Sequence, residues 1–229
     1  MTWVGVDVVA ANLAARGSAG CAFENVYFEI PAGGLAAVVG SAGSGRTSLL
    51  WALAGRLRLV TGRLAVGGHR HEDEAGAIRD LVAVARLEPG CALDPWLRVG
   101  EVIEERALIG GPRFSESTLA AAFDALGIAA PAEAVLVGDL AQSEQSLLAV
   151  ALAAAQRPGA VVVDDIGAGC TDDEARWVWE RLRALSEQGC TVIAAASSPP
   201  LDDVTVITLA HPRDADAPAR DRADLQENV

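Results

Sequence analysis

The chain has 229 residues, of which 51% are hydrophobic and 21% are charged, so a large core can form and global disorder is excluded. The 31 acidic residues outnumber the 18 basic ones, and the net charge of −13 argues against a nucleic-acid partner, which would need a basic face. The longest apolar run, Leu147–Ala155, is about half as long as a membrane-spanning helix, and the first residues lack the basic region of a signal peptide. We therefore expect neither kind of segment.

The first strands are predicted from short apolar patterns. Val26, Phe28 and Ile30 alternate with polar neighbours, which is typical of a half-buried strand. The run Leu35–Val39 predicts a fully buried strand, and a glycine-rich loop then leads into an amphipathic helix over residues 47–57.

Residues 62–68 predict an edge strand between glycine turns. The polar segment His69–Asp73 follows it and places histidines close to acids. We interpret this segment as an exposed hairpin loop, with a metal site as the less favoured alternative.

The pattern changes at about residue 87. Three helical patterns separated by glycine and proline occupy residues 99–110, 116–128 and 131–136, without β-branched runs. A helical subdomain over residues 87–138, inserted into an α/β core formed by residues 1–86 and 139–210, is the simplest interpretation.

The α/β alternation then resumes with a helix over residues 143–156, a strand over Ala160–Val163 and a helix over Asp172–Glu187. Two further strands follow, and the series predicts a parallel sheet covered on both faces. Trp177 and Trp179 cannot share one helix face, so one should be in the core and the other at the surface. The acidic tail, residues 211–229, is polar and expected to be disordered.

The four cysteines, Cys21, Cys91, Cys170 and Cys190, form no paired motif, and this spacing predicts reduced, cytosolic thiols. All 18 basic residues are arginine, and this bias bears on the phosphate-binding motif.

The strongest motif lies between the buried strand and the first helix, and its spacing is that of the phosphate-binding P-loop. Glycines let successive N–H groups point at phosphate oxygens, the helix N-terminus adds a positive dipole end, and Thr47 offers a hydroxyl to Mg²⁺. Arg46 replaces the usual lysine, and its longer, planar group predicts poorer γ-phosphate positioning. A glycine-rich turn that binds nothing is the alternative. The predicted ATP-binding residues are Gly40, Ser41, Ala42, Gly43, Ser44, Gly45, Arg46, Thr47 and Ser48.

A second motif ends the strand over residues 160–163. Two acids follow it, and beside a P-loop we expect Asp164 to lie near Mg²⁺ and Asp165 to face the attacking water. The alternative is that the two acids only cap a helix or turn.

Together these motifs resemble the nucleotide-binding domain of ATP-binding-cassette (ABC) transporters, along the chain to about residue 210. The segments that carry the resemblance are residues 25–55, 88–103 and 140–165. The resemblance implies a P-loop NTPase core of the α/β class, with an antiparallel β subdomain and an inserted helical subdomain. It also implies ATP and Mg²⁺ as cofactors, a second nucleotide-binding domain and a membrane permease as partners, and a cytoplasmic location peripheral to the inner face of the membrane.

Several motifs depart from the family pattern. The signature segment is Leu140–Glu144, with Ala141 where the family has a phosphate-binding serine. The other replacements are Leu87 at the glutamine-loop position, Asp165 at the general-base glutamate, Ser197 at the switch histidine, Thr171 at the aspartate of the D-loop, and Arg16 near the position of the adenine-stacking aromatic. We therefore expect Asp165 and Ser197 to be weak catalytic groups, and little hydrolysis by the isolated chain.

Two functional hypotheses follow. The first is an ATP-binding subunit that is the degenerate half of a heterodimer, since a homodimer would contain two altered sites. The second is a pseudo-ATPase, a regulatory or structural module that turns nothing over. ABC ATPases of DNA repair or translation fit poorly, because this acidic single cassette lacks their coiled-coil inserts and basic surfaces.

The surface that the family uses to receive a permease helix corresponds here to residues 87–99. Trp96 is a large apolar group in this proline-containing loop and is a candidate docking anchor. The alternative is that Trp96 packs into the helical subdomain.

Overall fold

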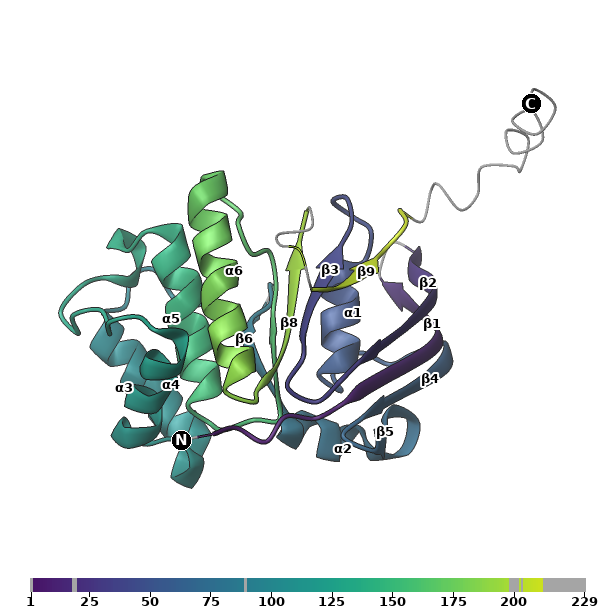
Figure 1. The fold of residues 1–229 in the computed structure, drawn as a ribbon, viewed down its shortest axis with the longest axis horizontal. Coiled ribbons are helices and arrows are strands. Elements are labelled where there is room, and N and C mark those ends of the chain that lie inside the picture. Colours follow the sequence, from purple (N-terminus) through teal and green to yellow (C-terminus); the bar gives the residue numbers. More distant parts are fainter. Residues whose placement is uncertain (1, 18–19, 89, 198–201, 203, 212–229) are drawn as a thin grey trace.

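The computed structural model describes residues 2–17, 20–88, 90–197, 202 and 204–211 (Figure 1). The acidic tail predicted over residues 211–229 therefore lies outside the described residues, except for His211. Within the described part of the chain, none of the helices has the length and apolar character needed to traverse a bilayer.

A five-stranded parallel sheet forms the centre of the molecule, in the order β6-β7-β8-β3-β9. The strands are β3 (Leu35–Val39), β6 (Val82–Arg86), β7 (Ala160–Val163), β8 (Thr191–Ala196) and β9 (Thr205–Thr208). A second sheet is antiparallel, in the order β2-β1-β4-β5, and consists of β1 (Val8–Gly17), β2 (Gly20–Ile30), β4 (Thr61–Val66) and β5 (His69–Arg70). The predicted class, an α/β core with an antiparallel β subdomain, is confirmed.

The helices divide between the two sides of the parallel sheet (Figure 1). Helix α1 (Arg46–Leu53) lies between the two sheets, and α2 (His71–Leu81) packs against β4 and β6. On the other side, α5 (Gln142–Ala154) and α6 (Asp172–Glu187) cover the parallel sheet. Helices α3 (Val99–Gly110) and α4 (Glu116–Leu126) form the outer part of that side, with the short 3₁₀ turns η1 (Gly111–Arg113) and η2 (Val137–Asp139).

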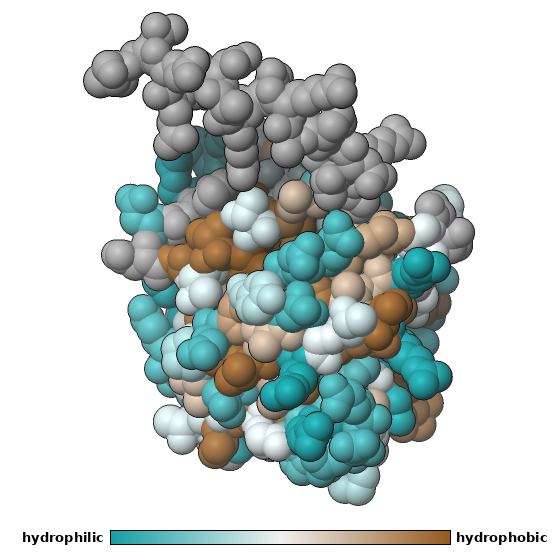
Figure 2. Space-filling view, turned by 90° about the vertical axis from the view of Figure 1, so that its right-hand side faces the viewer, coloured by the Kyte–Doolittle hydropathy of each residue, from teal (hydrophilic) through white to brown (hydrophobic). Residues whose placement is uncertain are grey.

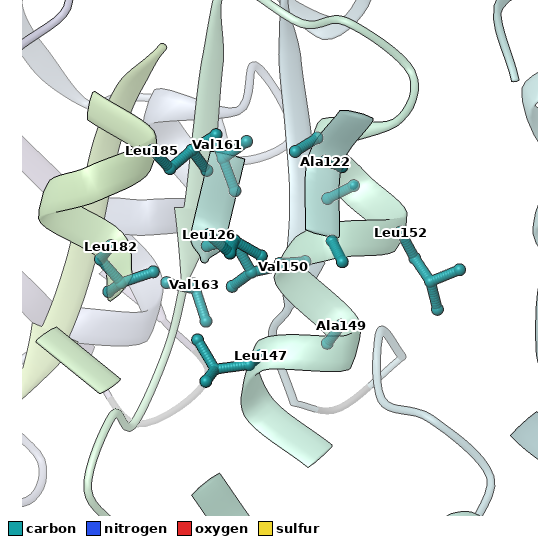
Figure 3. Close-up of a cluster of buried hydrophobic side chains, with 14 of the residues drawn as sticks. Ala122, Leu126, Leu147, Ala149, Val150, Leu152, Val161, Val163, Leu182 and Leu185 are labelled. Carbon is teal, nitrogen blue, oxygen red and sulfur yellow. The ribbon is translucent and has the colours of Figure 1, made fainter. Parts of the chain in front are cut away.

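Strand alternation explains why two cores form. Along β7, Val161 and Val163 belong to the core on the α5/α6 side, whereas Ala160 and Val162 belong to the core shared with α1 and the antiparallel sheet. Successive side chains point to opposite faces of a strand, so a fully apolar run supplies both cores. Figure 3 shows Val161 and Val163 among the leucines of α4, α5 and α6.

Helix α5 is buried on nearly all sides. Every residue from Leu147 to Ala154 is buried, so the long apolar run of the sequence forms the centre of the helical layer. Leu147 and Val150 contribute to the cluster in Figure 3. Truncating a leucine such as Leu147 to alanine should cost about 2–5 kcal/mol of folding free energy.

The antiparallel sheet has one packed and one solvated face. The exposed positions of β1 and β2 alternate with buried ones such as Leu13, Phe23 and Ile30. Figure 2 looks onto this side of the molecule and shows hydrophilic and hydrophobic residues interspersed over it, as expected for a half-solvated sheet.

The N-terminal residues cross the amino end of the parallel sheet and tie its layers together. The indole N–H of Trp3 donates to the carbonyl of Ala154 at 3.1 Å, and the Trp3 side chain is buried. The hydroxyl of Thr191 at the start of β8 accepts from the N–H of Val6 at 3.1 Å and from that of Gly33 at 2.9 Å, and it donates to the Val6 carbonyl at 2.7 Å. One buried hydroxyl therefore joins three distant segments.

Three local predictions were wrong. Residues 69–73 do not form an exposed hairpin loop, because β5 is followed directly by α2, where His71 is buried. Strand β4 is not an edge strand, since it lies between β1 and β5. Residues 131–136 are not helical. The prediction for the tryptophan pair is confirmed, with Trp179 buried and Trp177 partly exposed.

Candidate nucleotide site

The loop between β3 and α1 has the curled backbone that the glycine pattern predicts. Gly43 and Gly45 have φ angles of 83° and 90°, in the left-handed region that side chains disfavour. A Cβ on Gly45 would lie 2.1 Å from the carbonyl oxygen of Ala22 on β2, so only glycine fits there. The antiparallel sheet thus packs directly against the loop and holds it in place.

Two buried polar groups point to an anion in this loop. The hydroxyl of Ser44 and one terminal nitrogen of Arg46, Nη1, are buried and have no hydrogen-bond partner among the described residues. The N-terminus of α1 lacks a side-chain cap, and its first turn contains no acidic residue. Unpartnered donors beside a free helix N-terminus fit a phosphate group.

The first acid after β7 meets the helix that follows the loop. The hydroxyl of Thr47 donates to Oδ2 of Asp164, although the two residues are 117 positions apart, and the N–H of Asp165 donates to Oδ1 at 2.8 Å. Asp164 is only 7% exposed. Burial raises the pKa of the Asp164 carboxyl, and the two hydrogen bonds partly oppose that rise. A hydroxyl and a carboxylate in contact are ligands that suit Mg²⁺.

The replacement of lysine by arginine has a visible consequence. Nη2 of Arg46 lies 3.7 Å from Oδ1 of Asp165, and the two side chains are 14% and 52% exposed, respectively. The cation expected to bind phosphate is thus paired with the acid expected to face the attacking water. Asp165 also has a φ of 55°, in the left-handed region that aspartate and asparagine adopt more readily than most other residues with a side chain.

These groups line one small cavity of about 180 Å³. Its walls are formed by Arg46, Thr47, Asp164 and Asp165, together with Arg86 and Glu88, whose charged groups lie 3.9 Å apart. The volume is below the range of about 300–1,000 Å³ for sites that enclose whole ligands. The cavity therefore suits phosphate and metal, and a nucleoside would lie outside it.

Arg86 and Glu88 were missed by the sequence reasoning, which considered only Leu87 between them. The side chain of Leu87 is fully buried in the core, whereas its two neighbours face the cavity. Period-two alternation at the end of β6 was the signal that could have found them.

The structure does not bring Arg16 and Ser197 into this cavity. Arg16 is exposed on β1 opposite Cys21, next to the part of β2 that packs on Gly45. Ser197 is exposed just after β8 and does not line the cavity. Among the described residues, no group of three or more His, Cys, Asp or Glu side chains is arranged to hold a metal ion.

Residues 23–167 match the protein family described as ABC transporter. The chain belongs to the ABC transporter family. The ABC-type transporter claG of Penicillium crustosum is 29% identical over 181 residues, covering 76% of this chain and 24% of the relative, so the chain spans about a quarter of that protein. The putative ABC transporter ATP-binding protein VNG_2317G of Halobacterium salinarum is 28% identical over 183 residues, covering 80% and 78% of the two chains.

Solved structures of ABC proteins share the fold. The dimeric, post-hydrolysis structure of the ATP-binding cassette MJ0796 with ADP and Pi has a TM-score of 0.69 and 17% identity, and covers 89% of this chain and 94% of that one. The two chains therefore have the same architecture, and this chain is an ABC nucleotide-binding domain in sequence family and in fold.

The segment predicted to be the ABC signature, Leu140–Glu144, leads into α5, and Ala141 provides no hydroxyl there. Ala141 precedes the helix and cannot cap it, and the carboxylate of Glu144 accepts from the Ala141 N–H at 3.0 Å. The side chain of Gln145 donates to the carbonyl of Leu140 at 2.9 Å. A carboxylate therefore occupies the N-terminal end of α5, where an anion would otherwise bind.

Thr171, which was predicted to lie at the D-loop position, caps a helix. Its hydroxyl accepts from the N–H of Glu174 at 3.3 Å, and the Glu174 carboxylate accepts from the Thr171 N–H at 2.7 Å. This reciprocal arrangement caps the N-terminus of α6.

Proposed function

We propose that this chain is the ATP-binding subunit of an ABC transporter and binds Mg-ATP through Gly40–Ser48, with Thr47 and Asp164 as Mg²⁺ ligands and Arg16 against the adenine. The observation that carries the proposal is the hydrogen bond between Thr47 and Asp164 beside a loop with unpartnered, buried donors. The bound ADP and Pi of the structurally similar cassette MJ0796 support the same assignment.

The residues have distinct tasks in this proposal. The loop N–H groups and the Ser44 hydroxyl bind phosphate oxygens. The Arg46 guanidinium breaks its ion pair with Asp165 and contacts the γ-phosphate instead. When bound, Mg²⁺ neutralises phosphate charge between Thr47 and Asp164. Asp165 then accepts a proton from the attacking water. Its side chain is one methylene shorter than that of glutamate, so its carboxylate lies farther from the water.

We also propose that the chain works as the degenerate half of a heterodimer. Ala141 supplies no hydroxyl, and the carboxylate of Glu144 lies at the end of α5 that would face a partner's γ-phosphate. The negative charges of this carboxylate and of the γ-phosphate repel each other. A homodimer would contain this repulsion at both of its sites, whereas a partner with an intact signature removes it from one of the two.

A membrane permease is the third element of the proposal, and it would place the chain in the cytoplasm at the inner face of the membrane. Trp96 is 82% exposed, which overturns the alternative that it packs into the helical segment. Its loop neighbours Leu93 and Leu97 pack against the core, so the loop is anchored while the indole remains at the surface. Exposed aromatic groups on a fixed loop are typical interface anchors.

Titration calorimetry with Mg-ATP tests the nucleotide site. We expect binding by the wild type, loss of binding in Gly45→Asp, and unchanged binding in Gly76→Asp, a matched change at an exposed helical glycine of α2. No binding by the wild type would refute the proposal.

Trp96→Ala tests docking. The variant should melt at the wild-type temperature and be lost from the membrane fraction of cells that contain the partner subunits. A large fall in melting temperature with continued membrane association would refute docking through Trp96.

The second candidate is a pseudo-ATPase, which the Arg46–Asp165 ion pair favours because it engages the base and the phosphate-binding cation with each other. Single-turnover hydrolysis with and without the partner subunit separates the two. Turnover that appears only with the partner supports the heterodimer. The absence of turnover both with and without the partner supports the pseudo-ATPase.

A further inference from the structure

A cavity beside the proposed docking loop is rich in arginine. It has a volume of about 580 Å³, and residues of the edge strand β6 and of helix α3, the two elements that border residues 87–98, line it. We call it the arginine cleft. Four arginines line it: Arg56 after α1, Arg79 on α2, Arg106 on α3 and Arg113 in η1.

The bonding of the four guanidinium groups leaves them able to bind a carboxylate. None of them forms an ion pair with a carboxylate of the described residues. Within the part of the chain that the structure describes, three of them donate to main-chain carbonyls: Arg56 to Ala54 at 3.0 Å, Arg79 to Gly55 at 3.1 Å and Arg113 to Asp80 at 3.3 Å. Most of their donor capacity therefore remains available.

Two further observations concern how the arginines of the cleft are partnered. Nε of Arg106 is buried and has no hydrogen-bond partner among the described residues. Partial burial lowers the pKa of Arg56, the charge of Arg79 lowers it further, and a nearby cysteine opposes these effects. Arginines that line one cavity repel one another, and an anion bound among them relieves that repulsion.

The local charge contrasts with that of the whole chain. The net charge is −13, yet the cleft contains four arginines and only two acidic residues, Asp80 and Glu105. A generally acidic surface repels acidic partners, so an acidic group that does bind is directed to this cleft.

The cleft also offers apolar surface. Ile109 lines it and is 66% exposed, and the β6 residues Val82 and Val84 form part of its wall. A ligand that satisfies both features has carboxylates on one side and aliphatic groups on the other, which describes an amphipathic acidic helix.

We propose that the arginine cleft receives an acidic, amphipathic helix of the partner subunit, with its Asp or Glu side chains paired to Arg106 and Arg113. This inference rests on the proposed function, since it gives the chemistry of the segment that docks beside residues 87–99. It predicts that the permease segment carries acidic residues at i, i+4 spacing, so that they meet the arginines along one face.

Fluorescence anisotropy of a labelled peptide tests the pairing. The probe is a helix-forming peptide of about 14 residues, long enough to approach stable helicity, with leucines on one face and glutamates at i, i+4 on the other. Its counterpart has glutamine at each glutamate. We expect the glutamate peptide to bind the wild type, more weakly at high salt, and the glutamine peptide to bind at least about tenfold less well, or ~1.4 kcal/mol.

Charge reversal locates the binding. Arg113→Glu, at an exposed position, and Arg106→Glu should each lower the affinity for the glutamate peptide by at least about tenfold. The matched control, Arg176→Glu on the exposed surface of α6, should leave binding unchanged. If Arg106→Glu fails to fold by circular dichroism, Arg113→Glu alone decides.

Three results would overturn the proposal. They are equal binding of the two peptides, an equal loss in Arg176→Glu, and binding of phosphatidylglycerol vesicles that depends on Arg113 while the glutamate peptide does not bind. The last result would assign the cleft to lipid headgroups.

The outcomes separate this inference from the proposed function. Arg113→Glu should bind Mg-ATP as the wild type does, because Arg113 lies outside the nucleotide cavity. Membrane association that survives Arg113→Glu and depends on Trp96 would remove the acidic-helix inference and leave the transporter function. Peptide binding by a chain that binds no ATP would remove the proposed transporter function and leave the acidic-helix inference.

Discussion

The ion pair between Arg46 and Asp165 should weaken ATP binding. In the structure the guanidinium that would contact the γ-phosphate is held by a carboxylate of the same chain, so the nucleotide must compete with that carboxylate. We predict that Asp165→Asn, which removes the charge and keeps the shape, tightens Mg-ATP binding.

The magnitude follows from the geometry. Two unit charges 3.7 Å apart interact by about 4–5 kcal/mol at an effective dielectric constant of ~20, which is an upper bound. Asp165 is 52% exposed, and solvent screening reduces such pairs to about 1 kcal/mol or less. Releasing Arg46 should therefore lower the Kd for ATP roughly fivefold.

A double-mutant cycle measured by titration calorimetry checks this value, because Asp165→Asn also removes a charge that repels phosphate directly. The variants are Asp165→Asn, Arg46→Gln and their combination, with Asp124→Asn on α4 as the matched control. The gain in affinity should be present with Arg46 and much smaller with glutamine in its place. An equal gain in both backgrounds would show that the ion pair has no part in it.

Three further predictions concern Gly45, Asp164 and Cys190. Gly45→Ala should lower the melting temperature by about 5–10 °C, since a left-handed residue strained by about 1–3 kcal/mol would also collide with Ala22, and Gly76→Ala should not lower it. Burial raises the pKa of Asp164 in the folded state, so ionising this carboxyl lowers the stability of the fold as the pH rises from the unfolded-state pKa through the folded-state pKa. Asp164→Asn should therefore raise the melting temperature at about pH 7 and lose that advantage near pH 3. The same variant should abolish Mg²⁺-dependent ATP binding. Burial raises the pKa of Cys190 to about 12, so mass spectrometry should find iodoacetamide on exposed Cys21 at about pH 8 but on Cys190 only after unfolding in guanidinium. A stable Gly45→Ala protein, a pH-independent gain in Asp164→Asn, or rapid labelling of folded Cys190 would each contradict the corresponding reasoning.

The elements with strong periodicity were predictable from the sequence. The strands Leu35–Val39 and Ala160–Val163 and the helix Asp172–Glu187 occur at the predicted residues, because continuous apolar runs and a capped amphipathic pattern are local signals. The helix His71–Leu81 was missed. It begins with charged residues, contains Gly76, and buries only His71 and Ile78, so its stability comes from packing against β4 and β6.

The candidate nucleotide site shows a similar division between what the sequence indicates and what only the fold reveals. Its loop and the two acids after β7 were recognised because each motif is contiguous in the sequence. The pairing of Arg46 with Asp165 was not, since it depends on where a long side chain reaches across 119 positions of sequence. Only the folded chain brings two separately encoded motifs close enough to interact.

The Thr191 hydroxyl and the Trp3 indole have a consequence for the order of folding. Their hydrogen bonds join residues 185 and 151 positions apart, so residues 3–6 are synthesised well before the segments to which they bind. Until β8 and α5 are synthesised, residues 3–6 have no surface to bind, and the amino end of the sheet stays open. Thr191→Val should therefore mainly raise the unfolding rate and change the folding rate little, because contacts that form last are absent from the folding transition state.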